Sequence, residues 1–419
     1  MVHISSIIYS EPPLTLAKTQ KRVCAQSVLS LWTAGRMKAL AIAASIGCLA
    51  TLCGPLRAAS EQQPLAQNGN NKICLDVVVT PKSGPPVAGL QQQDFTLLDN
   101  KAPQTIASFQ ALQGSTAPAE VIVVVDAVNM PYEKIPYERD QIDKFLHANG
   151  GRLAYPTVVA FFTDTNTRIE DAFSTDGNVV SNFLDQYELP LKTIPRTTGF
   201  YGALERLELS TKVLSLLAAR EAPRPGRKII LWVSPGWPYL ATTDAKIDLK
   251  QRSEIFANIV RLSTQLREAH ITLYAIDPLP EGFVVAPLPA GNPYRRDSLP
   301  SPGRAGTSAP VTQDGDVTFV NLLYKDFLKG VTDARQASTG DLALQVLAVQ
   351  SGGLALTGSK YVDDLMRQAI VDTENYYEIS FDPPAARHPD EYHQIQIKVA
   401  RPGLTARTRQ GFYAQPVSQ

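Results

Sequence analysis

The fold of this chain is decided by the stretch Val121-Ile-Val-Val-Val-Asp126-Ala-Val-Asn129-Met130. Its five consecutive β-branched residues predict a strand that is buried on both faces, as in the centre of a parallel sheet. In an open α/β sheet, ligands bind just beyond the carboxyl ends of the central strands. Asp126 ends the apolar run, so we predict that it lies at that edge of the sheet.

The residues that follow alternate between strand and helix patterns. Apolar stretches predict further buried strands at 156–165, 229–233, 271–276 and 352–357, and an antiparallel edge strand at 167–173. Helical spacing predicts helices at 135–148, 177–187, 199–220, 255–269, 338–350 and 359–373. The apolar side of the helix at 199–220 is predicted to carry Leu204, Leu207, Leu214 and Leu217. This alternation predicts an α/β fold with a doubly wound, mostly parallel, Rossmann-like sheet.

Short β patterns lie at both ends of this α/β region. They are found at 72–80, 95–99 and 104–110, and again at 376–381, 393–399 and 405–413. Neither group is large enough to bury a good core by itself. We therefore predict that the N-terminal and C-terminal strands form one β-sandwich into which the α/β domain is inserted. Two separate β subdomains are the alternative.

Together these features resemble the VWFA-related proteins, a family with the von Willebrand factor type A fold found in many acidobacterial genomes. In that fold the first strand leads into a metal-binding motif, Asp-x-Ser-x-Ser. Asp126 matches the motif, whereas Val128 and Met130 occupy the two serine positions. The resemblance implies a threonine from the second loop, which Thr198 matches, and an acid from the third loop, where Ser234 stands instead. It also implies protein–protein recognition.

The altered motif predicts a degenerate metal-ion-dependent adhesion site. Mg²⁺ prefers near-octahedral oxygen ligation, and the predicted ligands are only Asp126, Asn129 and Thr198. We expect no cofactor beyond a weakly held Mg²⁺. In the alternative interpretation, Asp126 and Asn129 cap the loop through hydrogen bonds to the backbone. A metal-dependent adhesion protein remains an alternative function.

Other polar and aromatic residues also follow the predicted strands and form a predicted binding rim. They are Asp164, Ser234, Trp237, Tyr239 and Asp277. Amphipathic aromatic side chains are favoured at the centres of protein contacts. The alternative is that the aromatic residues pack over the end of the sheet.

Sequence motifs for catalysis are absent. The chain has no Gly-x-Ser-x-Gly elbow and no phosphate-binding Gly-x-x-x-x-Gly-Lys-Ser/Thr loop. None of its five histidines has metal-ligand spacing with a cysteine or another histidine. We therefore expect a non-enzymatic module, and the enzymatic alternative is a hydrolase or phosphotransferase that uses Asp126 together with Asp277.

Composition and the N-terminal pattern bear on partners and location. The formal net charge is 0, from 40 basic and 40 acidic residues, which argues against nucleic acid as a partner. The stretch Met37–Ala59 has a basic start, an apolar run and a small-residue exit, as in a secretory signal peptide. We expect translation to start at Met37, no membrane span after cleavage, and an exported chain that is periplasmic, envelope-associated or extracellular. Its expected partner is an unidentified protein, and a structural role in the cell envelope is a further alternative.

The predicted domain organisation follows from these patterns. The successive segments are the upstream extension and signal peptide (1–59), a flexible leader (60–71), the N-terminal β unit (72–115), the α/β domain (118–373) with a long insertion (278–315), and the C-terminal strands (375–415).

Overall fold

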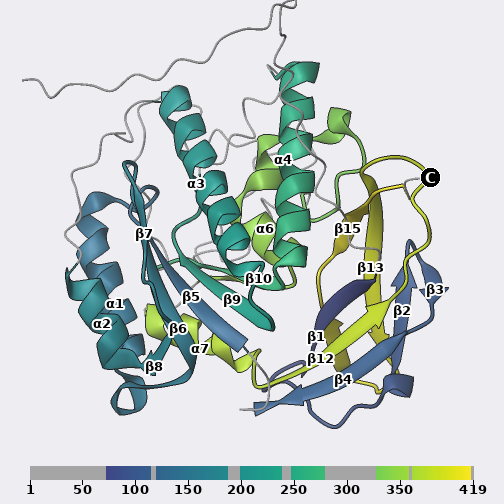
Figure 1. Ribbon diagram of the computed structural model, residues 1–419, viewed down its shortest axis with the longest axis horizontal. Coiled ribbons are helices and arrows are strands. Elements are labelled where there is room, and N and C mark those ends of the chain that lie inside the picture. Colours follow the sequence, from purple (N-terminus) through teal and green to yellow (C-terminus); the bar gives the residue numbers. More distant parts are fainter. Residues whose placement is uncertain are drawn as a thin grey trace, which may run out of the picture. The chain divides into compact units, whose positions relative to one another are not determined.

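The computed structural model of the chain describes six stretches of residues, all within one compact unit that spans Gln67–Gln419 (Figure 1). These stretches are 72–114, 119–186, 199–237, 247–278, 327–357 and 361–416. The predicted signal peptide, the leader, Thr198, Tyr239 and all but the first residue of the predicted insertion lie outside them.

The centre of the α/β domain is a seven-stranded, mostly parallel sheet. Its strand order is β11-β10-β9-β5-β6-β7, and β8 also pairs with β6. The strands are β5 (Ala119–Asp126), β6 (Arg152–Phe162), β7 (Thr167–Ile169), β8 (Ser174–Asp176), β9 (Arg227–Val233), β10 (Ile271–Ile276) and β11 (Ala355–Leu356). The strand β5 runs parallel between β9 and β6. All five residues from Val121 to Val125 are at most 1% exposed, so the predicted central strand is confirmed.

Helices cover both faces of this sheet, as the predicted doubly wound fold requires (Figure 1). Alternate β5 residues face opposite sides: Ile122 and Val124 belong to one core, and Val121, Val123 and Val125 to the other. The first core is closed by α3 (Gly199–Glu221), α4 (Leu249–Glu268) and α6 (Leu344–Gln350). The second is closed by α1 (Ile135–Leu146), α2 (Gly177–Gln186) and α7 (Val362–Val371).

Several details of the predicted α/β elements differ from the structure. The edge strand predicted at 167–173 is only the three residues of β7, and the separate strand β8 begins at Ser174. The helix predicted at 338–350 is a 3₁₀ turn at Thr339–Leu342 followed by the shorter α6. The strand predicted at 352–357 is only the two residues of β11, because Gly353 lies against β10 so closely that a Cβ would sit 1.9 Å from the carbonyl oxygen of Leu273. In α3, Leu204 is 40% exposed and lies outside the buried stripe.

The terminal strands form two four-stranded antiparallel sheets, with orders β14-β1-β12-β4 and β15-β13-β2-β3. The N-terminal strands are β1 (Ile73–Pro81), β2 (Phe95–Asp99), β3 (Ala102–Gln104) and β4 (Ser108–Gln113). The C-terminal strands are β12 (Asn375–Phe381), β13 (Glu391–Val399), β14 (Leu404–Arg407) and β15 (Gly411–Ala414). Each sheet contains strands from both ends of the chain, and one shared core includes Leu75, Leu97, Tyr377 and Phe412. The predicted union of the two ends is confirmed, and the alternative of two separate β subdomains is wrong.

Two predicted strands each divide between the two sheets. The stretch 405–413 becomes β14 in one sheet and β15 in the other, and 104–110 likewise divides between β3 and β4. In the first case the connection carries the buried Thr408 and Arg409. It packs so tightly on Gly352 that a Cβ there would lie 2.9 Å from the backbone nitrogen of Arg409. Contact with a distant glycine therefore ends the strand.

Arg227, at the start of β9, joins the central sheet to the β-sandwich. Its guanidinium lies 4.7 Å from the ring centroid of Tyr376 on β12 and 3.7 Å from a carboxylate oxygen of Asp76 on β1. It also donates a 3.1 Å hydrogen bond to the carbonyl of Asp372. The side chain of Arg227 is only 2% exposed, so this buried cation depends on partners from both parts of the fold.

Candidate functional site

The carboxyl ends of four adjacent strands bring most of the predicted site residues to one edge of the sheet. Asp126 ends β5, Ser234 follows β9, Asp277 follows β10, and Asp164 lies just after β6. The strand order places these ends side by side. The backbone agrees, because the amide of Ser234 donates to the carbonyl of Ile276 over 2.8 Å.

The Asp126 carboxylate is completely buried and accepts four hydrogen bonds. Its Oδ1 accepts from the backbone amides of Val128 (3.1 Å) and Asn129 (2.9 Å). Its Oδ2 accepts from Nδ2 of Asn129 (2.8 Å) and from Nε1 of Trp232 (2.9 Å). An ionised carboxylate has about four lone-pair sites, so these donors satisfy it. The geometry agrees with the loop-capping interpretation, with the indole of Trp232 as an additional donor that the sequence analysis missed.

Asn129 extends this network to helix α3. Its Nδ2 donates a second hydrogen bond, of 3.0 Å, to Oγ of Ser210. The Ser210 hydroxyl in turn donates to the carbonyl of Arg206, one helical turn earlier, over 2.7 Å. All three side chains are at most 8% exposed. Asn129 therefore connects the loop after β5 to the helix that covers one face of the sheet.

The residues at the two serine positions of the motif contribute to apolar packing. Val128 is 3% exposed and belongs to the core that also contains Trp232 and Trp237. Met130 is 0% exposed and packs with Ala127 and Ile135. These positions offer neither an oxygen ligand nor space at the surface.

The groups that contact the Asp126 carboxylate do not fit Mg²⁺. The groups around Asp126 are N–H donors, which oppose a cation, whereas Mg²⁺ requires oxygen ligands. The hydroxyl of Ser234 accepts a 3.2 Å hydrogen bond from the amide of Gly236. Elsewhere in the six described stretches, no group of three or more His, Cys, Asp and Glu side chains is arranged to hold a metal ion.

Trp237 packs inside the fold instead of projecting from the edge. It is 4% exposed, and its ring meets Trp232 edge-on, with centroids 5.1 Å apart and an interplanar angle of 74°. Trp232 makes a similar contact with Phe162, at 6.0 Å and 73°. For Trp237 the geometry therefore agrees with the alternative in which the aromatic residues pack over the end of the sheet.

A hollow of about 330 Å³ lies at the same edge, between the β6–β7 turn and α3. Its lining combines the apolar side chains of Phe162, Leu209, Val213 and Leu216 with the polar residues Thr163, Asp164, Thr165, Asn166, Thr167 and Lys212. Leu216 is 49% exposed, and Lys212 forms a 2.7 Å ion pair with Glu208 next to it. Of the predicted rim residues that the structure describes, only Asp164 lines this hollow. The sequence pattern did not predict this hollow, because Leu216 lies outside the apolar stripe predicted for α3. A leucine on the polar side of that helix was the signal that could have indicated it.

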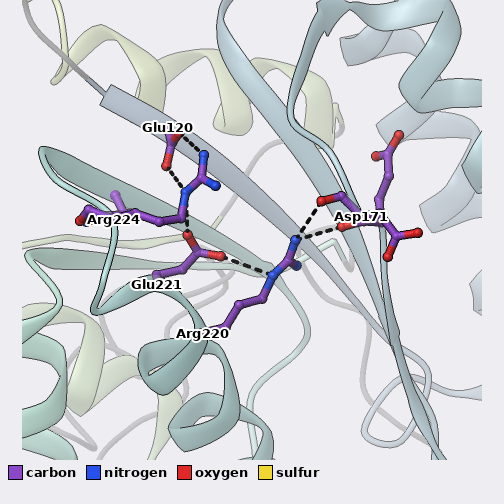
Figure 2. Close-up of polar contacts among 7 residues, drawn as sticks. Glu120, Asp171, Arg220, Glu221 and Arg224 are labelled. Carbon is purple, nitrogen blue, oxygen red and sulfur yellow. Dashed lines mark hydrogen bonds and ion pairs between the residues drawn. The ribbon is translucent and has the colours of Figure 1, made fainter.

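A cluster of charged side chains ties the end of α3 to the beginning of β5. Figure 2 shows Glu221 between two arginines, with its carboxylate oxygens 3.5 Å from Nε of Arg220 and 3.3 Å from Nε of Arg224. Arg224 also binds Glu120 with both Nε and Nη2. Arg220 donates a 2.8 Å hydrogen bond to the carbonyl of Glu170. Each charge here has a partner inside the fold, so the cluster holds elements together.

Burial is the largest cause of the pKa shifts of Glu221 and Lys228 in this cluster. The Glu221 side chain is 0% exposed, and its burial raises the pKa of the carboxyl group, although Arg220 and Arg224 act in the opposite direction. Burial also lowers the pKa of Lys228, whose ammonium donates to the carbonyl of Arg224. Both shifts disfavour the charged form.

Comparison with known proteins finds neither a protein-family model nor a curated protein that matches this chain. Among the helices of the described stretches, none combines the length and the apolar character that crossing a membrane requires.

Proposed function

We propose that this chain is an exported, non-enzymatic protein-binding module of the VWFA-related type, and that it binds its partner without a metal ion at Asp126. The observation that carries the proposal is the hydrogen bond from Nε1 of Trp232 to Oδ2 of Asp126, 2.9 Å long. It makes the carboxylate of Asp126 part of the buried structure instead of a ligand-facing group.

A cation at this position would have to displace the present donors. Moving the Asp126 carboxylate toward a metal leaves Nε1 of Trp232 and Nδ2 of Asn129 without their acceptor. Each buried donor left unsatisfied costs about 1–3 kcal/mol. The same donors oppose an enzymatic use of Asp126, because a nucleophile or base needs a free oxygen that faces substrate.

The hollow beside α3 supplies a contact surface of the right chemistry. Leu216 is exposed at its margin, Val213 and Phe162 lie in its wall, and the ion pair of Lys212 with Glu208 stands next to it. An apolar centre with a polar margin is the usual arrangement of protein interfaces. The apolar side chains in its wall favour an aliphatic or aromatic side chain of a protein partner as the occupant. The size of the hollow limits the occupant to one or two such groups.

The test uses Leu216→Lys, with Leu249→Lys on α4 as the matched control. Leu249 is also an exposed helical leucine, at 68%, but it does not line the hollow. Each purified chain is cross-linked to proteins of the native secreted and envelope fractions, and the captured proteins are compared by mass spectrometry. We expect the wild type and the control to retain a partner that Leu216→Lys loses. Equal capture by all three chains would refute the assignment of this surface.

A further inference from the structure

Among the strands that the structure describes, β4 lies at an edge and lacks the charges, proline and bulge that usually protect an edge. It forms one side of the sheet β14-β1-β12-β4, where its described partner is β12, from Ser108 opposite Ser380 to Gln113 opposite Asn375 (Figure 1). Its six residues, Ser-Phe-Gln-Ala-Leu-Gln, include no charge and no proline. Natural edge strands are usually short or bear lysine, proline or a bulge, since an open edge is a template for another strand.

The other sheet edges in the described stretches are protected in these ways. The strand β3 has three residues and contains Pro103, β7 has three and contains Arg168, and β11 has only two. The strand β14 has four residues and ends at Arg407. The strand β15 also has four, and its Tyr413 packs edge-on against Phe256 of α4 at 5.9 Å. The longer and uncharged β4 therefore differs from all of them.

Packing on both faces holds β4 in an extended shape. Phe109 points into the sandwich, where its ring lies 5.5 Å from that of Phe95 and 5.7 Å from that of Tyr377. On the opposite face, Leu112 is 7% exposed and packs with Val78 and Tyr376. One side chain on each face thus anchors β4. The strand is therefore already ordered when another strand pairs with it.

We propose that β4 pairs antiparallel with β4 of a second copy of this chain, which joins two four-stranded sheets into one continuous sheet. A two-fold axis normal to the sheet makes the interface isologous. It also keeps each residue opposite one from the same face, as strand pairing demands. Since β4 carries no charge, two identical edges meet without like-charge repulsion.

The register centred on Gln110 is self-complementary. Gln110 lies opposite its own copy, and its side-chain amide can both donate and accept a hydrogen bond. Phe109 then lies opposite Ala111, a large residue against a small one on the same face. Gln110 and Ala111 are both exposed in the single chain. Pairing of one strand buries little area, so the dimer is expected to be weak and concentration-dependent. This surface is separate from the hollow beside α3, and the inference does not depend on the proposed function.

Sedimentation equilibrium of the purified chain over a range of concentrations tests the pairing. We expect the wild type to self-associate reversibly and Gln110→Lys to lose the association, because two lysines would then face each other. Ala111→Pro should also abolish it by removing a backbone N–H. The control is Thr405→Lys, which places the same charge on the exposed residue of β14 at the opposite edge of the same sheet and should leave the association unchanged.

A charge-pair rescue separates direct pairing from damage to the fold. An equimolar mixture of Gln110→Lys and Gln110→Glu chains should form a heterodimer, although each variant alone should remain monomeric. A wild type that is monomeric at every concentration overturns the self-pairing, whatever other strand this edge accepts. A dimer that survives in Gln110→Lys, or a mixture that forms no heterodimer, overturns it as well.

Discussion

The indole Nε1 of Trp232 donates a 2.9 Å hydrogen bond to Oδ2 of Asp126, and both side chains are completely buried. The two residues come from adjacent parallel strands, with Trp232 opposite Val124, two residues before Asp126. The bond therefore crosses from β9 to the end of β5. It gives the buried carboxylate a hydrogen-bond partner from the neighbouring strand.

Replacement of Asp126 should lower the free energy of unfolding. Its effect on any binding of a metal ion should be small. Asp126→Ala leaves the buried donors of Trp232, Asn129 and Val128 without an acceptor, so we expect a loss of about 3 kcal/mol in the free energy of unfolding. The control is Asp164→Ala at the same edge of the sheet, where the side chain is only partly buried, with an expected loss of about 0.5 kcal/mol. Urea denaturation measures both, and equal losses would contradict the assigned role of Asp126.

Removal of divalent cations should leave the protein unchanged. The donors around Asp126 are N–H groups, and a weak site adds little stability at modest concentrations of ligand. We expect the same melting temperature with and without EDTA, and no heat of binding in calorimetry with Mg²⁺, Mn²⁺ or Ca²⁺. Tight binding that disappears in Asp126→Ala would instead favour the metal-dependent adhesion protein.

The buried Glu221 should make stability depend on pH. Its burial raises the folded-state pKa of the carboxyl group above its ordinary value of 4.5. The group therefore stabilises the fold fully only below the unfolded pKa, and this contribution is lost as the pH rises through the folded pKa. We expect the stability of Glu221→Gln relative to the wild type to increase as the pH rises above the ordinary pKa of 4.5.

Urea denaturation at several pH values measures this difference for Glu221→Gln. The matched control is Glu205→Gln, an exposed glutamate on the same helix, which should show the same difference from wild type at every pH. Parallel stability profiles for Glu221→Gln and the wild type would show that the buried carboxylate is fully compensated by Arg220 and Arg224.

Arg227 connects the β-sandwich to the central sheet, so even a conservative replacement of this residue should lower the stability of the protein. Lysine lacks the planar group that lies 4.7 Å from the ring of Tyr376 and reaches Asp372 and Thr272. We expect Arg227→Lys to lower the free energy of unfolding by about 2 kcal/mol. Arg335→Lys serves as the control, because Arg335 is 79% exposed and pairs only at the surface. A difference of less than about 0.5 kcal/mol between the variants would contradict this role.

The sequence predicted the parts of the fold that depend on local pattern. The β-branched run at Val121–Val125 can only be a strand buried on both faces, and the small β units at the two ends needed each other to form a core. The division of 405–413 into β14 and β15 was not predictable, because it depends on the close approach of Arg409 to Gly352.

The candidate site was predicted in part for the same reason. The capping of the loop by Asp126 and Asn129 is local, within three residues, and the sequence offered it as an alternative. The hydrogen bond from Trp232 joins residues 106 positions apart, and Trp232 looked like any other apolar residue of its strand. Its role depends on the order of strands in the sheet, which a pattern of hydrophobicity does not fix.

The pairing of β1 with β12 also has a consequence for biosynthesis. Ile73 of β1 lies opposite Phe381 of β12. The strand β1 is therefore synthesised about three hundred residues before the strand with which it pairs. The α/β domain can fold in the meantime, and it then brings the two ends of the chain close together, which lowers the entropy lost when the long loop closes. Translation must therefore pass β12 before this edge of β1 is paired, and a chaperone that holds the nascent N-terminal strands would act in that interval.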